Sequence, residues 1–365
     1  MSDSKVLLTP GPLTTSTQVK QSMMSDMGTR DQEYYDLAQE TRMMLLRLAQ
    51  ADERDYTAVL IPGSGTYGVE SVLCSVVKEN EKVLILSNGA YGERMGQICQ
   101  KAQIPYELVR CSMIHQLDVK AVEEQIARED ITHVAYIHSE TTAGVLNDIT
   151  GLQEVIHRYH KISIVDAMSS FGAVEMSMDE LQVDYLIASS NKCLHGVPGL
   201  AFVIAKRSHL DQCANVAHSL SLDLHAQYRF MEDNLGAFRF TSPTHVLRAL
   251  HRAMEEMIAM GGVSARHQRY VKLQRQFCEA MVKQGFQTLV PAKDQGVVIT
   301  TFLYPQGFDF AHFYEYFKSN GFLLYRGKLS DYDAFRIGNI GAIEDKDVDR
   351  FIALLQAYYK KENGK

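Results

Sequence analysis

The chain has 365 residues, of which 46% are hydrophobic and 22% are charged, the composition of a globular protein with room for two domains. Its formal net charge of −7 excludes a broad basic surface for nucleic acid or for an anionic membrane. Because no apolar stretch is long enough for a membrane span and the start, MSDSKVLLTPGPL, shows no signal-peptide pattern, we expect a cytoplasmic protein.

Short apolar runs alternate with helical patterns over the first two thirds of the chain. Segments such as Val119–Arg128 and Leu152–Tyr159 have helical periodicity. The alternation predicts an α/β domain with a mostly parallel sheet that helices cover on both faces. The expected strands are Ala58–Ile61, Lys82–Leu86, His133–Ile137, Ile162–Val165, Asp184–Ser189 and Leu200–Ala205.

The pattern changes after Thr241. Two long helices, HVLRALHRAMEEMIAMGG and RHQRYVKLQRQFCEAMVKQG, are followed by the strand-like GVVITTFLYP, a helix near Phe310–Asn320, the strand-like GFLLYRG and AFRIGNIG, and a terminal helix. We therefore expect a large α/β domain over residues 16–255 and a smaller α+β domain made of residues 1–15 and 256–365.

The segments that follow the first five strands carry residues suited to ligand binding. In open α/β sheets, ligands collect at the carboxyl ends of the strands. In chain order these segments are IPGSGTYG, SNGAYG, HSETTAG, IVDAMSSFG and SSNKCLHGVPG. They carry Ser64, Gly65, Thr66, Tyr91, Ser139, Thr141, Thr142, Asp166 and Lys192.

Each of these features alone has an ordinary structural explanation. The G-S-G-T run also describes plain turns, Tyr91 could pack in the core, and a lone lysine usually lies on a solvated face. The combination is more informative, because Asp166 emerges from an apolar strand and needs a cationic partner there.

Together the features match the needs of pyridoxal 5′-phosphate (PLP). Backbone N–H groups at a glycine-rich helix start favour a phosphate, and Tyr91 offers a flat face for the ring. Asp166 can keep the pyridine nitrogen protonated, and Lys192 can form a Schiff base with the aldehyde. We therefore predict PLP as the cofactor and expect Lys192 to be buried beside it.

Seven motifs strengthen this prediction. LLTPGPLT, SNGAYG, HSETTAGVLNDI, IVDAMSSFG, SSNKCLHGVPG, FRFTSPTH and FRIGNIG closely resemble those of the 2-aminoethylphosphonate:pyruvate aminotransferases, which are class V PLP-dependent enzymes. The resemblance runs from Leu7 to FRIGNIG, and its most specific part is Asp166–Gly199. It implies the aspartate aminotransferase-like fold (fold type I).

The resemblance also implies roles around the cofactor ring. Lys192 would form the Schiff base and carry the proton during catalysis, and Asp166 would pair with the pyridinium nitrogen. Thr141 would hydrogen-bond on the side of the phenolic oxygen, and Tyr91 would stack on the ring.

The phosphate would lie at Ser64, Gly65 and Thr66, together with Asn191. In this family a threonine of the partner subunit reaches the same phosphate, and Thr241 matches it. The resemblance therefore implies a homodimer in which two subunits build each site.

Three further residues have less settled roles. Arg336 matches the family arginine that binds the anionic end of the substrate, with a structural ion pair as the alternative. Arg30 could add a second positive contact for a phosphonate or form a surface salt bridge. His195, where we expect glutamine more often in related sequences, could be an acid–base group or a packed turn histidine.

The activity implied is transfer of the amino group of 2-aminoethylphosphonate to pyruvate, which gives phosphonoacetaldehyde and L-alanine in phosphonate catabolism. An alanine–glyoxylate or serine–pyruvate aminotransferase of the same family is the alternative. A cysteine desulfurase would need a thiol on a mobile loop, whereas Cys278 lies in a helical pattern.

Other classes fit less well. A non-catalytic binding protein would have no need to keep both Asp166 and Lys192. A redox enzyme is disfavoured, because no dinucleotide-binding fingerprint follows the first strand. The six cysteines show no C-x-x-C spacing and are expected to be reduced thiols, and the thirteen histidines include no H-E-x-x-H motif, so we predict no metal site.

Overall fold

The computed structural model describes residues 5–362 except 328 and 330. Its main sheet has seven strands, and six of them lie within two residues of the predicted bounds. All are mutually parallel except the second strand in the order, which is antiparallel to both neighbours, so the mostly parallel sheet is confirmed. In spatial order they are β2 (Tyr56–Gly63), β10 (Gly199–Lys206), β9 (Tyr185–Ser189), β8 (Ile162–Asp166), β5 (His133–Ile137), β3 (Val83–Ser87) and β4 (Tyr106–Arg110).

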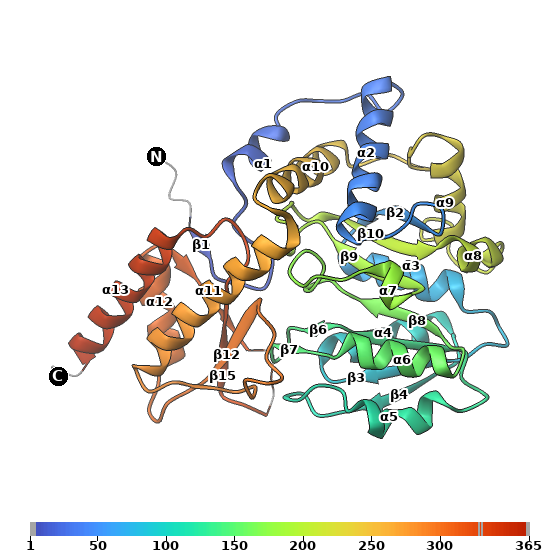
Figure 1. Ribbon diagram of the computed structural model, residues 1–365. Coiled ribbons are helices and arrows are strands. Elements are labelled where there is room, and N and C mark those ends of the chain that lie inside the picture. Colours follow the sequence, from blue (N-terminus) through green and yellow to red (C-terminus); the bar gives the residue numbers. More distant parts are fainter. Residues whose placement is uncertain (1–4, 328, 330, 363–365) are drawn as a thin grey trace.

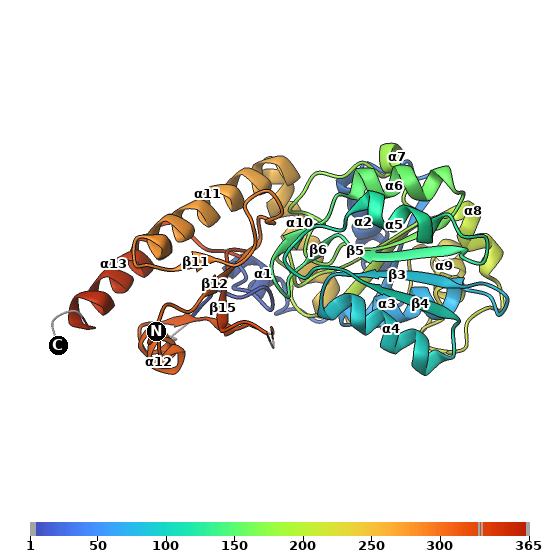
Figure 2. The same cartoon turned by 90° about the horizontal axis from the view of Figure 1, so that it is seen from below.

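Helices cover both faces of this sheet, as expected (Figure 2). One face carries α3 (Gly65–Val76) and α4 (Ala90–Ala102), and the other carries α5 (Val119–Ile126), α6 (Ile149–Arg158) and α7 (Met178–Leu181). Strands β3, β5 and β9 are buried along their whole length, because each is covered on two sides. The edge strand β4 was not predicted, since its half-buried residues form no apolar run.

A second, smaller layer lies beside the large sheet (Figure 1). Its four strands are β11 (Gln287–Thr288), β12 (Ile299–Leu303), β15 (Ala334–Gly338) and β14 (Tyr325–Arg326). The helices α11 (Gly262–Val282), α12 (Phe310–Ser319) and α13 (Asp345–Glu362) pack against it around a core rich in phenylalanine. The expected domain boundary between residues 255 and 256 would fall inside α10 (Thr244–Ala259).

The N-terminal segment begins in the smaller layer and then crosses to the larger one. Strand β1 (Val6–Leu7) pairs in parallel with β13 (Phe322–Leu323), and Gly338 N–H donates to the Leu8 carbonyl over 3.1 Å. The chain continues into α1 (Thr17–Ser22), which packs on α10. Residues 8–14, which we call the strap, therefore lie between the two layers.

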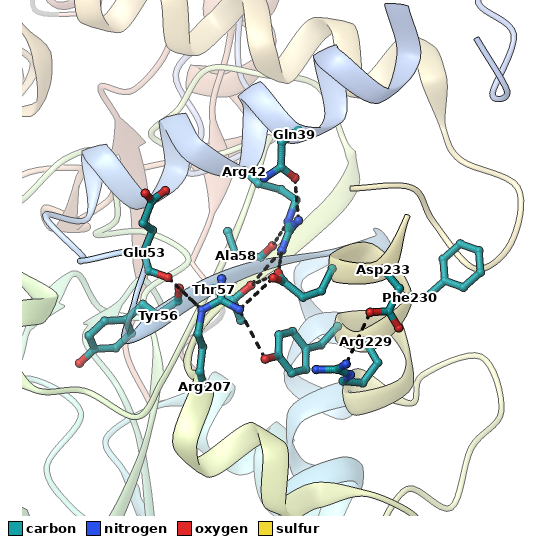
Figure 3. Close-up of polar contacts among 12 residues, drawn as sticks. Gln39, Arg42, Glu53, Tyr56, Thr57, Ala58, Arg207, Arg229, Phe230 and Asp233 are labelled. Atoms are coloured by element: carbon teal, nitrogen blue, oxygen red, sulfur yellow. Dashed lines mark hydrogen bonds and ion pairs between the residues drawn. The ribbon is translucent and has the colours of Figure 1, made fainter. Parts of the chain in front are cut away.

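A buried arginine network fixes the helices at the β2 edge of the large sheet (Figure 3). Arg42 of α2 (Gln32–Leu48) donates to the Ala58 carbonyl over 2.8 Å and forms an ion pair with Glu232 of α9 (Leu224–Asp233). Arg207 donates to Glu232 from the other side over 2.9 Å and also holds the carbonyl of Tyr56. The network anchors α9, and the chain leaves this helix for the segment that carries Thr241.

Among the described residues, no helix is long and apolar enough to cross a membrane, and no group of three or more histidine, cysteine or acidic side chains is placed to hold a metal ion. The six cysteines are all free thiols.

Candidate active site

A cavity of about 210 Å³ lies at the carboxyl edge of the large sheet. Nine of the residues singled out in the sequence line it, and they come from five different strand ends. The carboxyl ends meet at one edge because β2 runs parallel to β3, β5, β8 and β9 even though β10 lies between. These nine residues are Ser64, Gly65, Thr66, Tyr91, Ser139, Thr141, Asp166, Asn191 and Lys192.

One end of the cavity is the start of α3. Ser64 is the residue before the helix, in an extended conformation, and its side chain makes no capping hydrogen bond. A Cβ on Gly65 would lie 2.5 Å from the Met168 sulfur, so a larger residue there would require the Met168 side chain to move. Gly63 has φ +136°, a conformation that favours glycine. The helix start therefore offers N–H groups and hydroxyls to an anion.

Asp166 ends β8 and is 5% exposed. Its carboxylate accepts a hydrogen bond from the Met168 N–H over 2.9 Å. Burial raises the pKa of Asp166 to about 7, and the Met168 N–H and the positive charges of Lys192 and Arg94 act in the opposite direction. A cation that enters the cavity beside this carboxylate would therefore stabilise the ionised form.

The raised pKa makes the stability of the ligand-free protein depend on pH. Between the ordinary pKa of 3.8 and a folded pKa of about 7, the folded state holds a proton that the unfolded state has released. The stabilisation is complete at lower pH and decreases by ~1.4 kcal/mol per unit as the pH rises to 7. The difference in unfolding free energy between wild type and Asp166→Asn, from denaturant titrations, should follow this slope, and a pH-independent difference would contradict it.

Lys192 is half-buried rather than buried, because its side chain borders the cavity. Its Nζ donates to the Pro10 carbonyl of the strap over 2.5 Å. A Cβ on Gly11 would lie 2.9 Å from the same nitrogen, so the strap packs directly on the lysine. This contact between residues far apart in sequence was not predicted.

Tyr91 lies in the first turn of α4, and a buried carboxylate fixes it. The Tyr91 N–H donates to Glu140 over 3.2 Å, and the Thr142 N–H donates to the same carboxylate over 2.9 Å. A Cβ on Gly89 would lie 2.4 Å from the Glu140 side chain, so this side chain packs directly on the Gly89 backbone. Burial raises the pKa of Glu140. Our sequence reasoning missed Glu140, although its place within HSETTAG was a signal.

Arg336 is next to the cavity but is not among the residues that line it. It projects from β15, is 2% exposed, and donates from Nη1 to the Thr141 carbonyl over 2.8 Å. Its Nε is buried and makes no hydrogen bond with the described residues. The alternative considered for Arg336 was a structural ion pair. Among the described residues its guanidinium instead donates to backbone carbonyls.

His195 is a packed turn histidine. Its Nε2 lies 2.9 Å from the Gly341 N–H, which donates to it, and 2.5 Å from the Tyr270 hydroxyl. Burial holds the pKa of His195 well below its ordinary range. Because Nε2 accepts these hydrogen bonds, the ring links the Lys192 turn to α11 and to the segment after β15.

A His195→Ala variant is therefore expected to lose about 1–3 kcal/mol of unfolding free energy, since two buried donors lose their acceptor. His195→Gln should lose less, because the amide oxygen can accept. Denaturant titration measures both changes. The pH profile of turnover should keep its wild-type shape in both variants, and loss of one limb would show that the imidazole transfers protons after all.

Two residues that were singled out lie elsewhere in the chain. Thr241 is exposed in the loop between α9 and α10, and Arg30 is exposed just before α2. Neither is among the described residues that line the cavity of their own chain.

A family model described as Aminotransferase class-V matches residues 13–328. The fold agrees with solved aminotransferase structures. It superposes with a TM-score of 0.90 on ureidoglycine–glyoxylate aminotransferase from Bacillus subtilis, at 22% identity over 98% of this chain and 94% of that one. An alanine–glyoxylate aminotransferase from Nostoc gives 0.88 at 20% identity, over 97% and 95%. The chain belongs to the class-V aminotransferases.

Within that family, the chain falls among the 2-aminoethylphosphonate–pyruvate transaminases. It is 48% identical to a protein of that name from Bacteroides fragilis (strain YCH46). The matched 354 residues cover 96% of this chain and 98% of the relative. A protein of the same name from Lysinibacillus sphaericus (strain C3-41) is 46% identical over 98% of each chain.

Proposed function

We propose that the chain moves the amino group of 2-aminoethylphosphonate to pyruvate with PLP as cofactor, giving phosphonoacetaldehyde and L-alanine. The observation that carries the proposal is that Asp166, Lys192 and the start of α3 open onto one cavity. Relatives named for this reaction support the choice of substrates.

The residues present fit the cofactor. The start of α3 would take its phosphate with help from Asn191, Tyr91 would face the ring, and Asp166 would meet the pyridine nitrogen. When bound, PLP supplies an aldehyde that bonds an amine and a ring that withdraws electrons from the carbon beside it.

Each chain residue then has a defined task. Asp166 is buried, and in its ionised form it would hold a proton on the ring nitrogen. Lys192, once released by the incoming amine, would move a proton between the substrate carbon that bears the nitrogen and the carbon of the cofactor aldehyde on the other side of that nitrogen. The Pro10 carbonyl, which accepts from Lys192 in this structure, would hold the released amine near that position.

Arg336 would bind the anionic end of either substrate. Its buried Nε has no protein partner among the described residues, and a guanidinium suits both a phosphonate and a carboxylate. Arg336→Gln is expected to raise KM for both substrates by roughly 10- to 100-fold. Steady-state kinetics with each substrate tests this, and Arg350→Gln, on the exposed face of α13, is the control that should change neither.

The oligomer, the domains and the location are parts of the same proposal. Thr241 is exposed beside Phe240, which is 52% exposed, and Tyr67 at the start of α3 is also 52% exposed. These features support a homodimer in which Thr241 reaches the phosphate site of the partner. The two sheets support a large domain of residues 16–255 and a small one from the rest, and the free cysteines support a cytoplasmic location.

A visible spectrum of the purified protein tests the function. A cofactor band that 2-aminoethylphosphonate bleaches and pyruvate restores is the expected result. Bleaching by alanine or serine alone would move the enzyme to the alanine–glyoxylate or serine–pyruvate type. No band after addition of PLP would contradict the proposed cofactor.

A further inference from the structure

Arg94 is a basic residue of the cavity that the sequence reasoning did not select. It lies three residues after Tyr91 on α4, so both side chains share one face of the helix. Its Nη1 donates to the Thr66 hydroxyl over 3.1 Å, and its guanidinium carbon lies 5.0 Å from the centre of the Tyr91 ring. Arg94 therefore bridges the aromatic face and the start of α3.

The charges around the cavity indicate a role for Arg94 in binding an anion. Among the described residues that line the cavity, the basic ones are Lys192 and Arg94. Once the Lys192 amine is bonded to the cofactor aldehyde, it cannot also form an ion pair with the cofactor phosphate. The start of α3 contributes the equivalent of only about half a positive charge, whereas a PLP phosphate carries nearly two negative charges. Arg94 can supply most of the difference.

Helix α4 holds Arg94 in place before any ligand arrives. The Glu140 carboxylate accepts from the Tyr91 N–H and fixes the first turn of the helix, one turn before Arg94. A guanidinium presents parallel donors that match two phosphate oxygens. Such a preorganised fork loses little side-chain entropy when it binds an anion.

We propose that Arg94 binds the 5′-phosphate of the cofactor from the α4 side, opposite the N–H groups and hydroxyls of Ser64–Thr66. This inference rests on PLP as the proposed cofactor. Arg336 serves the substrate instead, because it contacts Thr141 and is not among the residues at the α3 end.

Cofactor titration of the cofactor-free protein tests the assignment without measuring turnover. Wild type, Arg94→Gln and Arg94→Lys are each titrated with PLP and with pyridoxal, which lacks the phosphate, and Kd is read from the absorbance change. The matched control is Arg110→Gln, because Arg110 is exposed and pairs with Glu93 of the same helix. Circular dichroism and thermal melting establish that each variant is folded.

Arg94→Gln is expected to raise the Kd of PLP by roughly 10- to 100-fold and to change that of pyridoxal by less than about threefold. Arg94→Lys, which keeps the charge but loses the fork, should lie between Arg94→Gln and wild type. Arg110→Gln should match wild type.

Two results would overturn the inference. Equal weakening of PLP and pyridoxal by Arg94→Gln would mean that Arg94 supports the Tyr91 face rather than the phosphate. Unchanged affinity for both would mean that it binds neither. Should the wild-type protein bind neither compound, the proposed function fails instead, so the two failures are distinguishable. If Arg94→Gln does not fold, Arg94→Lys decides by the same comparison.

Discussion

Replacing Lys192 by alanine is expected to lower turnover of 2-aminoethylphosphonate by at least about 10⁴-fold, because one side chain has two tasks. It would bond the cofactor and then move the proton between the substrate carbon and the carbon of the cofactor aldehyde. Proton transfer by a positioned side chain alone raises the rate by about 10²- to 10⁴-fold. The methyl group of alanine can do neither. The variant should still fold, since Lys192 is half-buried and borders the cavity rather than a hydrophobic core.

Single-turnover and steady-state assays measure the loss, with Lys120→Ala as the control on the exposed face of α5. Titration with PLP adds a second readout. The variant should bind the cofactor without the visible band that reports a covalent bond to the chain. Turnover within tenfold of wild type would show that another group carries the proton.

The fold and most of the cavity could be predicted because their signals are local. An apolar run followed by a polar residue marks a buried strand and its end, and this pattern located both Asp166 and Lys192. The parallel sheet then brings separate strand ends to one edge, which explains why nine of the residues singled out in the sequence line a single cavity.

Contacts between distant segments could not be predicted in this way. Neither the Pro10 carbonyl at Lys192 nor the Arg336 guanidinium at the Thr141 carbonyl follows from any sequence spacing. The antiparallel strand β10 has the same apolar pattern as a parallel strand, so its direction in the sheet could not be predicted from the sequence. Arg94 was different, because its spacing of three residues from Tyr91 on a predicted helix could have revealed it.

An Asp166→Asn variant is expected to lose roughly 10²- to 10³-fold in kcat/KM while keeping the fold. The amide has nearly the same shape, and its oxygen can still accept from the Met168 N–H. It lacks the charge that would hold a proton on the ring nitrogen, and removing one partner from a buried ion pair costs about 3–5 kcal/mol.

Asp184→Asn is the matched control for this effect. Asp184 is as buried as Asp166, but it accepts hydrogen bonds from Ser163 and pairs with Lys206, away from the cavity. Loss of the Asp184 charge should lower the unfolding free energy and leave kcat/KM of the folded enzyme within about threefold of wild type. If Asp166→Asn behaves in the same way, the carboxylate of Asp166 is structural and the ring nitrogen does not depend on it. If only Asp166→Asn loses turnover, the buried charge at the end of β8 is needed for the chemistry itself.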